Sequence, residues 1–443
     1  MRVLLAQSTL YVPTFAGENK VNRVLMEGLA THGHACHVLA PTCGKQGPQT
    51  PAQFRRELEL RGIVATVSGR GESYVFHQNG VAVHAVVEPS NFCPYLARRI
   101  REFQPTHVIT SAGDPGLVLL EAVLTAASCP VVYLAHTPLY FPFGPVSLIV
   151  TPARQALFHR LAGIVAVSQY CCDYIRKWAG LEATVIYAPV YGRGPFRQYG
   201  DFGSGFITMI NPCAYKGISI FLALARAMPE ISFAAVPTWG TTRSDRAALE
   251  AVPNVRILEA RDNVDDIYSQ TRVLLVPSLW DEGFGVVCVE AMLRGIPVLA
   301  SDTGGLPEAK LGVDHLLPVH PITQCRHASD SQGLRMPVVP KQDIDPWLRA
   351  LRELLTDRDR YERLSAVSRD TACAFASSLG IEPFEKFLNE ATSQGRARPS
   401  MVAQDSVGER FLHRVEGLTH QKQQLLLTRL RQKPDEPTHA KSG

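Results

Sequence analysis

The 443-residue sequence lacks any run of eighteen or more uncharged apolar residues, and its net charge is only +4. A helix that crosses a bilayer needs about 20 apolar residues, so no membrane-spanning helix is predicted. A net charge this small over this length does not favour nucleic acid as a partner. The opening MRVLLAQSTLYVP is too short for a secretory signal and is read as a strand, so a cytoplasmic location is expected.

Paired cysteines and clustered metal ligands are also missing. The ten cysteines are scattered without C-x-x-C pairs or histidine spacing, which favours neither a zinc site nor a disulfide framework. Cys171 and Cys172 are adjacent and poorly placed to bridge. No acidic metal motif stands out, so no metal is expected. Hydrophobic content of 46% and charged content of 19% indicate a globular α/β protein, long enough for two or three domains.

The most informative stretch is PSLWDEGFGVVCVEAMLRGIPVLASDTGGLPE, residues 277–308. It predicts a turn and glycine loop after a buried strand at 271–276, then a helix from about Val286 and a second strand at 297–301. Ligands bind where such loops open at the carboxyl ends of parallel strands. Gly283 and Gly285 let the backbone come close to a ligand. The N-terminus of the helix that follows is a predicted phosphate-binding site.

Glu282 and Glu290 bracket this loop, eight positions apart. Eight residues are a little over two helical turns, which predicts that the two carboxylates share one helix face. Carboxylates beside an anion-binding site repel phosphate. We therefore expect Glu282 and Glu290 to accept hydrogen bonds from hydroxyl groups. A sugar and a ribose offer several.

The first half of the chain alternates strands and helices, as a doubly wound parallel sheet does. Arg2–Gln7 is a predicted strand, and an amphipathic helix with apolar positions from Val21 to Leu29 follows a loop that holds Gly17. His136 follows the predicted strand 131–135, at the end where such sheets bind ligands. The alternative for His136 is a structural role, in which a cap or turn fixes the side chain. His107 lies inside a predicted strand and is predicted to be structural.

A second alternating region opens at about Phe206, after a Gly- and Pro-rich hinge at 187–205. Strand 206–211 leads through the loop PCAYKG into helix 218–227. Lys216 in that loop is a positive charge that can bind a phosphate. A solvated lysine is the alternative.

EGFGVVCVEAMLRGIPVLASDTGGLPE closely resembles the E-x7-E motif of the retaining glycosyltransferases of family 4, and the resemblance covers residues 1 to 391. It implies the GT-B architecture, two Rossmann-like domains that face each other across a cleft. It further implies that Glu282 and His136 contact the transferred sugar, Glu290 the ribose, and Lys216 the diphosphate. The residues expected on the donor by this resemblance are Gly17, Asn211, Lys216, Glu282, Gly283, Phe284, Gly285, Val286 and Glu290.

The chain departs from that family pattern at three places. The family has an arginine five residues before the lysine, where this chain has Asn211, and Arg243 is a candidate substitute. Ala16–Gly17 stands where the family usually has two glycines, and APVYG where it has PNGVD.

The predicted domains are 1–195 on the acceptor side, completed by a crossing helix near 381–391, and 205–378 on the donor side. A polar insertion is expected at 320–342. Residues 392–443 are predicted to be a linker and an amphipathic tail. LTHQKQQLLLTRLRQK in that tail resembles the helical lead of condensation domains in peptide synthetases, which implies an assembly-line partner. A solvated tail, or one that packs on its own enzyme, remains open.

The expected function is transfer of a hexose or pentose from a nucleotide sugar to an acceptor hydroxyl with retention, in glycan or natural-product synthesis. The resemblance implies no metal or cofactor and a leaving phosphate that helps to deprotonate the acceptor. Two alternatives remain open: a nucleotide-sugar epimerase on the same fold, and a catalytically silent docking or binding protein. The identity of the acceptor and the donor is not fixed by any motif.

Overall fold

The computed structural model describes residues 1–14, 16–44, 47–69, 71–114, 116–147, 150–261, 263–329 and 335–395. One compact unit spans Met1–Gly395. The predicted tail and its assembly-line contact lie on residues 396–443, outside the described residues. None of the helices described in these ranges is both long enough and apolar enough to span a bilayer.

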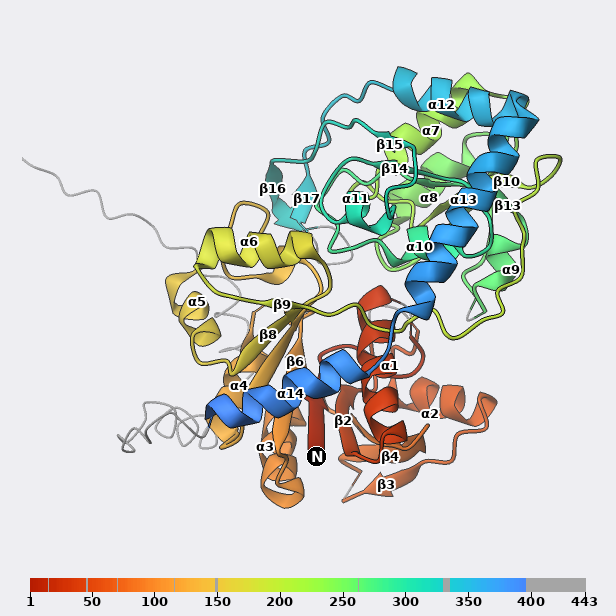
Figure 1. The fold of residues 1–443 in the computed structure, drawn as a ribbon. Helices are drawn as coiled ribbons and strands as arrows, with labels where there is room; N and C mark the ends of the chain where they lie inside the picture. Colours follow the sequence, from red (N-terminus) through yellow and green to blue (C-terminus); the bar gives the residue numbers. More distant parts are fainter. Residues whose placement is uncertain are drawn as a thin grey trace, which may run out of the picture. The chain divides into compact units, whose positions relative to one another are not determined.

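The first sheet has nine strands in the order β3-β4-β5-β2-β1-β6-β7-β8-β9 (Figure 1). Its strands are β1 (Arg2–Ala6), β2 (Ala35–Pro41), β3 (Thr66–Ser68), β4 (Ser73–Gln78), β5 (Val81–Val86), β6 (His107–Ser111), β7 (Val131–Ala135), β8 (Gly163–Ala166) and β9 (Thr184–Val185). Its helices are α1 (Gly17–Thr31), α2 (Pro51–Leu60), α3 (Phe92–Phe103), α4 (Val118–Ala126), α5 (Pro152–Phe158) and α6 (Gln169–Ala179), with 3-10 turns at Pro89–Asn91 and Pro138–Tyr140. β1, β6 and β7 have almost continuous burial because helices cover both faces of a parallel sheet.

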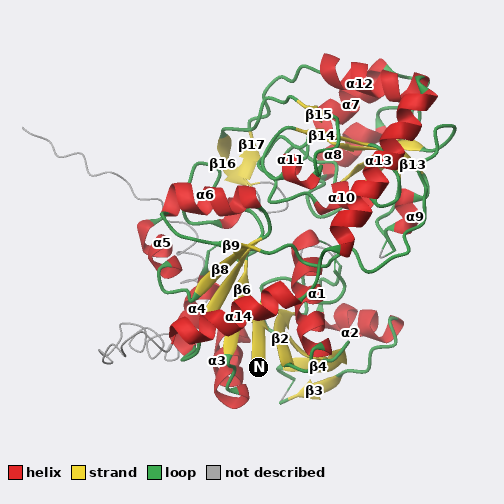
Figure 2. Cartoon of the chain, in the orientation of Figure 1, coloured by secondary structure: helices red, strands yellow, loops and turns green. Residues whose placement is uncertain are grey.

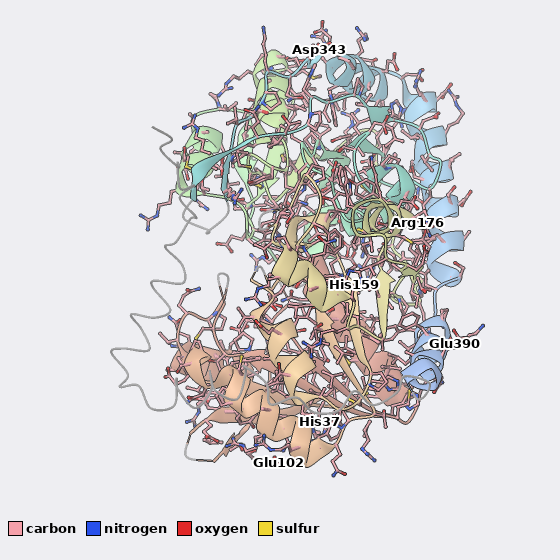
Figure 3. The ribbon with its side chains drawn as sticks, turned by 90° about the vertical axis from the view of Figure 1, so that its left-hand side faces the viewer. His37, Glu102, His159, Arg176, Asp343 and Glu390 are labelled. Atoms are coloured by element: carbon pink, nitrogen blue, oxygen red, sulfur yellow. The ribbon has the colours of Figure 1, made fainter. Side chains whose placement is uncertain are left out.

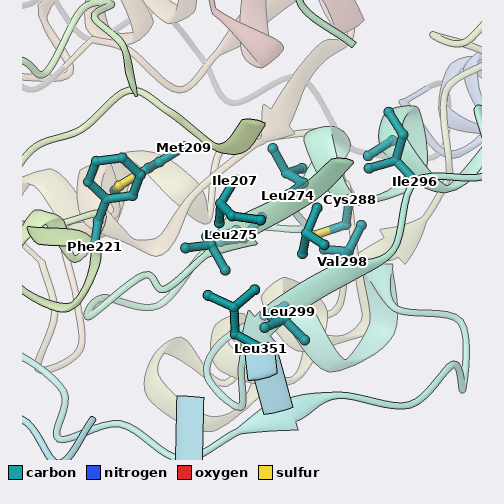
Figure 4. Packing of buried hydrophobic residues seen from close by; sticks show 14 of the residues in the cluster. Ile207, Met209, Phe221, Leu274, Leu275, Cys288, Ile296, Val298, Leu299 and Leu351 are labelled. Carbon is teal, nitrogen blue, oxygen red and sulfur yellow. The ribbon is translucent and has the colours of Figure 1, made fainter. Parts of the chain in front are cut away.

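The second sheet has six parallel strands in the order β12-β11-β10-β13-β14-β15. They are β10 (Phe206–Ile210), β11 (Phe233–Val236), β12 (Val255–Ile257), β13 (Thr271–Val276), β14 (Val298–Ser301) and β15 (Leu316–Leu317). Its helices are α7 (Ile218–Ala227), α8 (Arg243–Glu250), α9 (Asp265–Tyr268), α10 (Val286–Met292), α11 (Leu306–Ala309), α12 (Asp345–Thr356) and α13 (Arg358–Ser377). Figure 4 shows its core, where Ile207, Leu275 and Leu299 from three adjacent strands lie among buried side chains.

The predicted two Rossmann-like sheets of the GT-B fold are present, and we call the parts that carry them the N-terminal half and the C-terminal half. Figure 2 shows helices around each sheet. The hinge segment between them enters the second sheet at β10. Charged side chains such as Glu102, Arg176 and Asp343 are exposed on the outside (Figure 3).

The predicted crossing helix is present as α14 (Glu382–Gly395), which runs four residues past the predicted end at Ala391. It lies against the first sheet in Figure 1, and its buried Phe384 and Leu388, with Ile381 just before the helix, belong to the core of the N-terminal half. The carbonyl oxygen of Leu388 lies 2.8 Å from His107 Nε2, so His107 holds this helix. The structural role predicted for His107 fits that contact.

The structure corrects one expectation about the fold and adds two details. β4 runs antiparallel to β3 and β5, so this edge of the first sheet is not parallel. The polar insertion 320–342 contains an antiparallel pair, β16 (Cys325–Ser329) and β17 (Arg335–Pro337). The short helices α5, α8 and α11 were not predicted, because seven-, eight- and four-residue segments are too short to show a helical period.

Candidate active site

A cavity of about 530 Å³ lies within the compact unit, and residues of both halves line it. Much of the lining comes from the loops that follow β1, β7, β10, β11 and β13, at the carboxyl ends of parallel strands. Nine of the ten predicted site residues line the cavity together: Gly17, His136, Asn211, Lys216, Glu282, Gly283, Phe284, Gly285 and Val286.

The glycines of the predicted loop are required by the backbone. Gly285 has φ of +113° and precedes α10, which begins at Val286 as predicted. A Cβ atom on Gly283 would lie 1.8 Å from the carbonyl oxygen of His136. The loop of the C-terminal half therefore touches the end of β7 in the N-terminal half, and only glycine fits at that contact.

Lys216 and Glu282 form an ion pair inside the cavity. Ser278 Oγ also donates to the Glu282 carboxylate, over 2.5 Å. Burial raises the pKa of Glu282, but the Lys216 ammonium and these hydrogen bonds outweigh it and hold the pKa below its ordinary value. The carboxylate is therefore ionised at neutral pH. Lys216 Nζ also lies 5.0 Å from the centre of the Trp280 ring, which favours the cation.

The structure corrects the predicted relation of Glu282 and Glu290. Glu282 lies in the loop before α10, so the two carboxylates do not share a helix face. Glu290 is on α10, where it forms an ion pair with Lys20 of α1 and accepts a hydrogen bond of 3.1 Å from Tyr268. Glu290 is absent from the residues that line the cavity. Its predicted contact with a ribose remains a prediction.

His136 is buried and its imidazole is neutral, because burial lowers its pKa to about 3. The hydrogen bonds of two amide side chains, Gln7 and Asn22, fix the tautomer of His136. Gln7 Nε2 donates to the carbonyl of Thr9, so Gln7 Oε1 accepts from Asn22 Nδ2 over 3.2 Å. Asn22 Oδ1 must then accept from His136 Nε2, 2.9 Å away. His136 Nδ1 carries the free lone pair and is a hydrogen-bond acceptor for a hydroxyl.

Asn211 follows β10 with φ of +59°, a conformation that asparagine tolerates better than most residues. Its Oδ1 accepts from the backbone N–H of Gly240 over 2.9 Å, while its buried Nδ2 has no partner among the described residues. The candidate substitute Arg243 begins α8, is exposed, and is not part of the cavity lining. In this structure it does not replace the missing positive charge.

Sequence reasoning missed two polar residues at the cavity end of α1. Glu18 lines the cavity, and its Oε1 is a buried atom without a partner among the described residues. Asn22 orients His136. The signal was present, because positions 18, 22, 25 and 29 form one helical stripe that begins with an acid and an amide and ends with two leucines.

Contacts between the halves at the cavity rim were also missed. Glu308 of α11 accepts from the backbone N–H of Gln169 over 2.9 Å and from Tyr187. Ser168, the N-cap residue of α6, also donates to the carbonyl of Gly283. The described residues contain no group of three or more His, Cys, Asp or Glu that could hold a metal ion.

Two family models match the chain. The model described as Glycosyltransferase Family 4 matches residues 16–191, and the one described as Glycosyl transferases group 1 matches residues 205–357. The first match covers the strands β2 to β9 of the first sheet, and the second covers the six strands of the second sheet.

Curated relatives are all partial matches. The sulfoquinovosyl transferase SQD2 of Arabidopsis thaliana is 24% identical over 301 residues, which is 62% of this chain and 55% of the relative. The D-inositol 3-phosphate glycosyltransferase of Mycolicibacterium smegmatis is 29% identical over 153 residues, 34% of this chain and 30% of the relative. The matched region thus spans about half or less of the length of these relatives.

Solved structures share the fold at low identity. A sucrose-phosphate synthase from Thermosynechococcus elongatus has a TM-score of 0.61 at 15% identity, over 90% of this chain and all of the other. The Anabaena protein HepE, solved in complex with UDP-glucose, has a TM-score of 0.57 at 16% identity, over 89% of this chain and all of the other.

Proposed function

This chain belongs to the family 4-like glycosyltransferases, and we propose that it transfers a sugar from a nucleotide-sugar donor to an acceptor hydroxyl. One observation carries the proposal: the Lys216–Glu282 pair of the C-terminal half and His136 of the N-terminal half line one cavity. Curated relatives named as glycosyltransferases, and a structural neighbour solved with UDP-glucose, support it.

The donor would lie along the C-terminal half of the cavity. Lys216 would pair with the diphosphate, and the glycine loop at Gly283 and Gly285 would let the backbone approach it. Glu282 is ionised and accepts hydrogen bonds, so it suits a sugar hydroxyl. His136 Nδ1 would accept a second hydroxyl from the opposite side.

The reaction we propose breaks the bond between the anomeric carbon and the diphosphate oxygen, and forms a bond from that carbon to the acceptor oxygen. The acceptor proton passes to a phosphate oxygen of the leaving nucleotide, with retention at the anomeric carbon. Lys216 would stabilise the charge that develops on the leaving group. We further propose that no metal ion takes part. Activity should then be the same with and without a chelator.

A thermal-shift panel of UDP-, GDP-, ADP- and dTDP-sugars tests donor binding, because a ligand of the folded state raises Tm by mass action. A donor at a hundredfold excess over its Kd adds about 2.7 kcal/mol of stability. The Lys216→Met variant should lose most of the shift. A flat panel for the wild type would contradict the proposal. Product formed from donor alone would instead indicate an epimerase.

The anomeric configuration of the product tests retention. Proton NMR of the fresh reaction mixture should show the same anomer in product and donor. The opposite anomer would contradict the retaining mechanism and leave sugar transfer itself intact.

A further inference from the structure

The N-terminal half of the cavity carries buried oxygen atoms that have no hydrogen-bond partner among the described residues. They are Thr9 Oγ1, Glu18 Oε1 and Asn19 Oδ1, and all three residues line the cavity. Asn19 is 6% exposed, and its Nδ2 is already used in a bond of 2.8 Å to the carbonyl of Leu10. Its free Oδ1 therefore needs a donor that the described protein does not supply. Unpaired buried polar atoms cost stability, so such a group at a cavity points to a ligand.

Glu18 lies beside the glycine loop of the C-terminal half, where an acceptor has to bind in order to meet the donor. It is the second residue of α1, and Gly17 before it faces the loop of the C-terminal half, since a Cβ there would lie 3.8 Å from Val286. Its carboxyl also packs on the backbone after β6, because a Cβ on Gly113 would lie 2.2 Å from Oε1. Glu18 is thus held at the carboxyl ends of the first sheet, next to the predicted donor loop.

The described residues around Glu18 favour an uncharged ligand over an anionic one. No described lining residue of the N-terminal half is a lysine or an arginine, and His136 is neutral. Burial raises the pKa of Glu18 to about 8, so the group is a neutral acid at pH 7 that both donates and accepts. The groups that interact with it electrostatically are the hydroxyls of Tyr133 and Tyr140. A buried phosphate or carboxylate here would have no positive partner among the described lining residues of the N-terminal half.

We propose that Glu18, with Asn19 and Thr9, forms the acceptor subsite and takes the hydroxyl groups of an uncharged acceptor. This inference rests on the proposed glycosyl transfer and adds the acceptor class to it. A hydroxyl can donate to Asn19 Oδ1 and exchange both kinds of hydrogen bond with the Glu18 carboxyl.

Saturation-transfer NMR tests the proposal with two probes, methyl glucoside and glucose 6-phosphate. Both are measured with the nucleotide sugar that gives the largest thermal shift already bound, so that the donor side is filled. We expect methyl glucoside to bind the wild type at least about 10-fold more tightly than glucose 6-phosphate. Glu18→Ala should weaken methyl glucoside about 10-fold, and Glu18→Gln, which keeps a donor and an acceptor, about 3-fold.

Glu27→Gln is the matched control, because Glu27 lies on the same helix and pairs with Arg23 away from the cavity lining. It should bind both probes as the wild type does. Tighter binding of glucose 6-phosphate, no binding of methyl glucoside to the wild type, or equal binding in Glu18→Ala would each overturn the subsite. Donor binding is read separately from the thermal shift, so failure of the proposed function would show as a wild type that no nucleotide sugar stabilises.

Discussion

The two halves of the cavity are built in different ways. The C-terminal half uses glycines and one ion pair: Gly283 and Gly285 shape the loop, and Lys216 faces Glu282. The N-terminal half uses buried polar groups, some linked in the Gln7–Asn22–His136 chain and some, such as Glu18 Oε1, without a partner. Polar atoms without a partner among the described residues occur on both sides, since Asn211 Nδ2 of the C-terminal half is one of them. The difference is charge: the C-terminal side carries the Lys216–Glu282 pair, whereas no described lining residue of the N-terminal half is a lysine or an arginine. A charged donor suits the first, and an uncharged acceptor suits the second.

The largest effect is expected from a substitution at the contact between the two halves. Gly283→Ala places a Cβ atom 1.8 Å from the carbonyl oxygen of His136, so one backbone must move. We expect a loss of about 4 kcal/mol in the free energy of unfolding, and loss of activity, because a clash with backbone is at the severe end of single substitutions. Chemical denaturation measures it.

Gly17→Ala is the matched control for that glycine, since its added Cβ would make only an ordinary contact of 3.8 Å with Val286. It should change stability by less than about 1 kcal/mol. Equal stability of both variants would mean that the halves separate readily at this contact.

Lys216→Met tests the charged side. We expect the rate to fall about 100-fold, because the cation that stabilises the leaving group is lost. The protein should also lose about 2 kcal/mol of stability, since the Glu282 carboxylate stays behind in a largely buried place. Steady-state kinetics and denaturation measure the two effects.

Lys216→Met combined with Glu282→Gln separates these causes. Removing both charges should restore most of the stability and none of the rate. A near-native rate in Lys216→Met would show that another cation binds the diphosphate.

The same contrast explains how much the sequence predicted. Glycine loops, long apolar strands and periodic helices are local signals, so β7, β13 and α7 were predicted with their observed bounds. That Lys216 and Glu282 share one cavity was expected from the resemblance to family 4, since both belong to short motifs that can be read from the sequence. The orphaned oxygen of Glu18 was not, because burial and the absence of a partner depend on contacts from distant segments such as Gly113. The antiparallel direction of β4 likewise depends on pairing, which alternation along one strand does not encode.

A smaller effect concerns Glu290, for which two roles are compared. Its carboxylate either binds the ribose or joins the two halves through the ion pair with Lys20. If Glu290 binds the ribose, Glu290→Gln should weaken nucleotide binding about 10-fold, because a charged hydrogen-bond acceptor is lost. Lys20→Met should then leave binding nearly unchanged, since Lys20 lies on α1 and only pairs with Glu290. Calorimetry with the nucleotide gives both values. Equal losses in the two variants would show that the ion pair acts by joining the halves.

The last effect is a dependence of stability on pH that arises within the N-terminal half. Burial raises the pKa of Glu18 to about 8, so the folded protein keeps a proton that the unfolded chain releases near its ordinary pKa of 4.5. The unfolded state therefore binds fewer protons between these values, and this group lowers stability as the pH rises through that window. His136 acts in the opposite direction: burial lowers its pKa to about 3, so stability is lost as the pH falls below 6.5.

Glu18→Gln should remove only the loss of stability at higher pH. Its Tm should therefore exceed that of the wild type at pH 8 and match it more closely at pH 5. Glu27→Gln should follow the wild type at both values. A Glu18→Gln curve parallel to the wild type from pH 5 to pH 8 would mean that the carboxyl is solvated and ionised, and the contrast between a charged donor side and a neutral acceptor side would then be wrong.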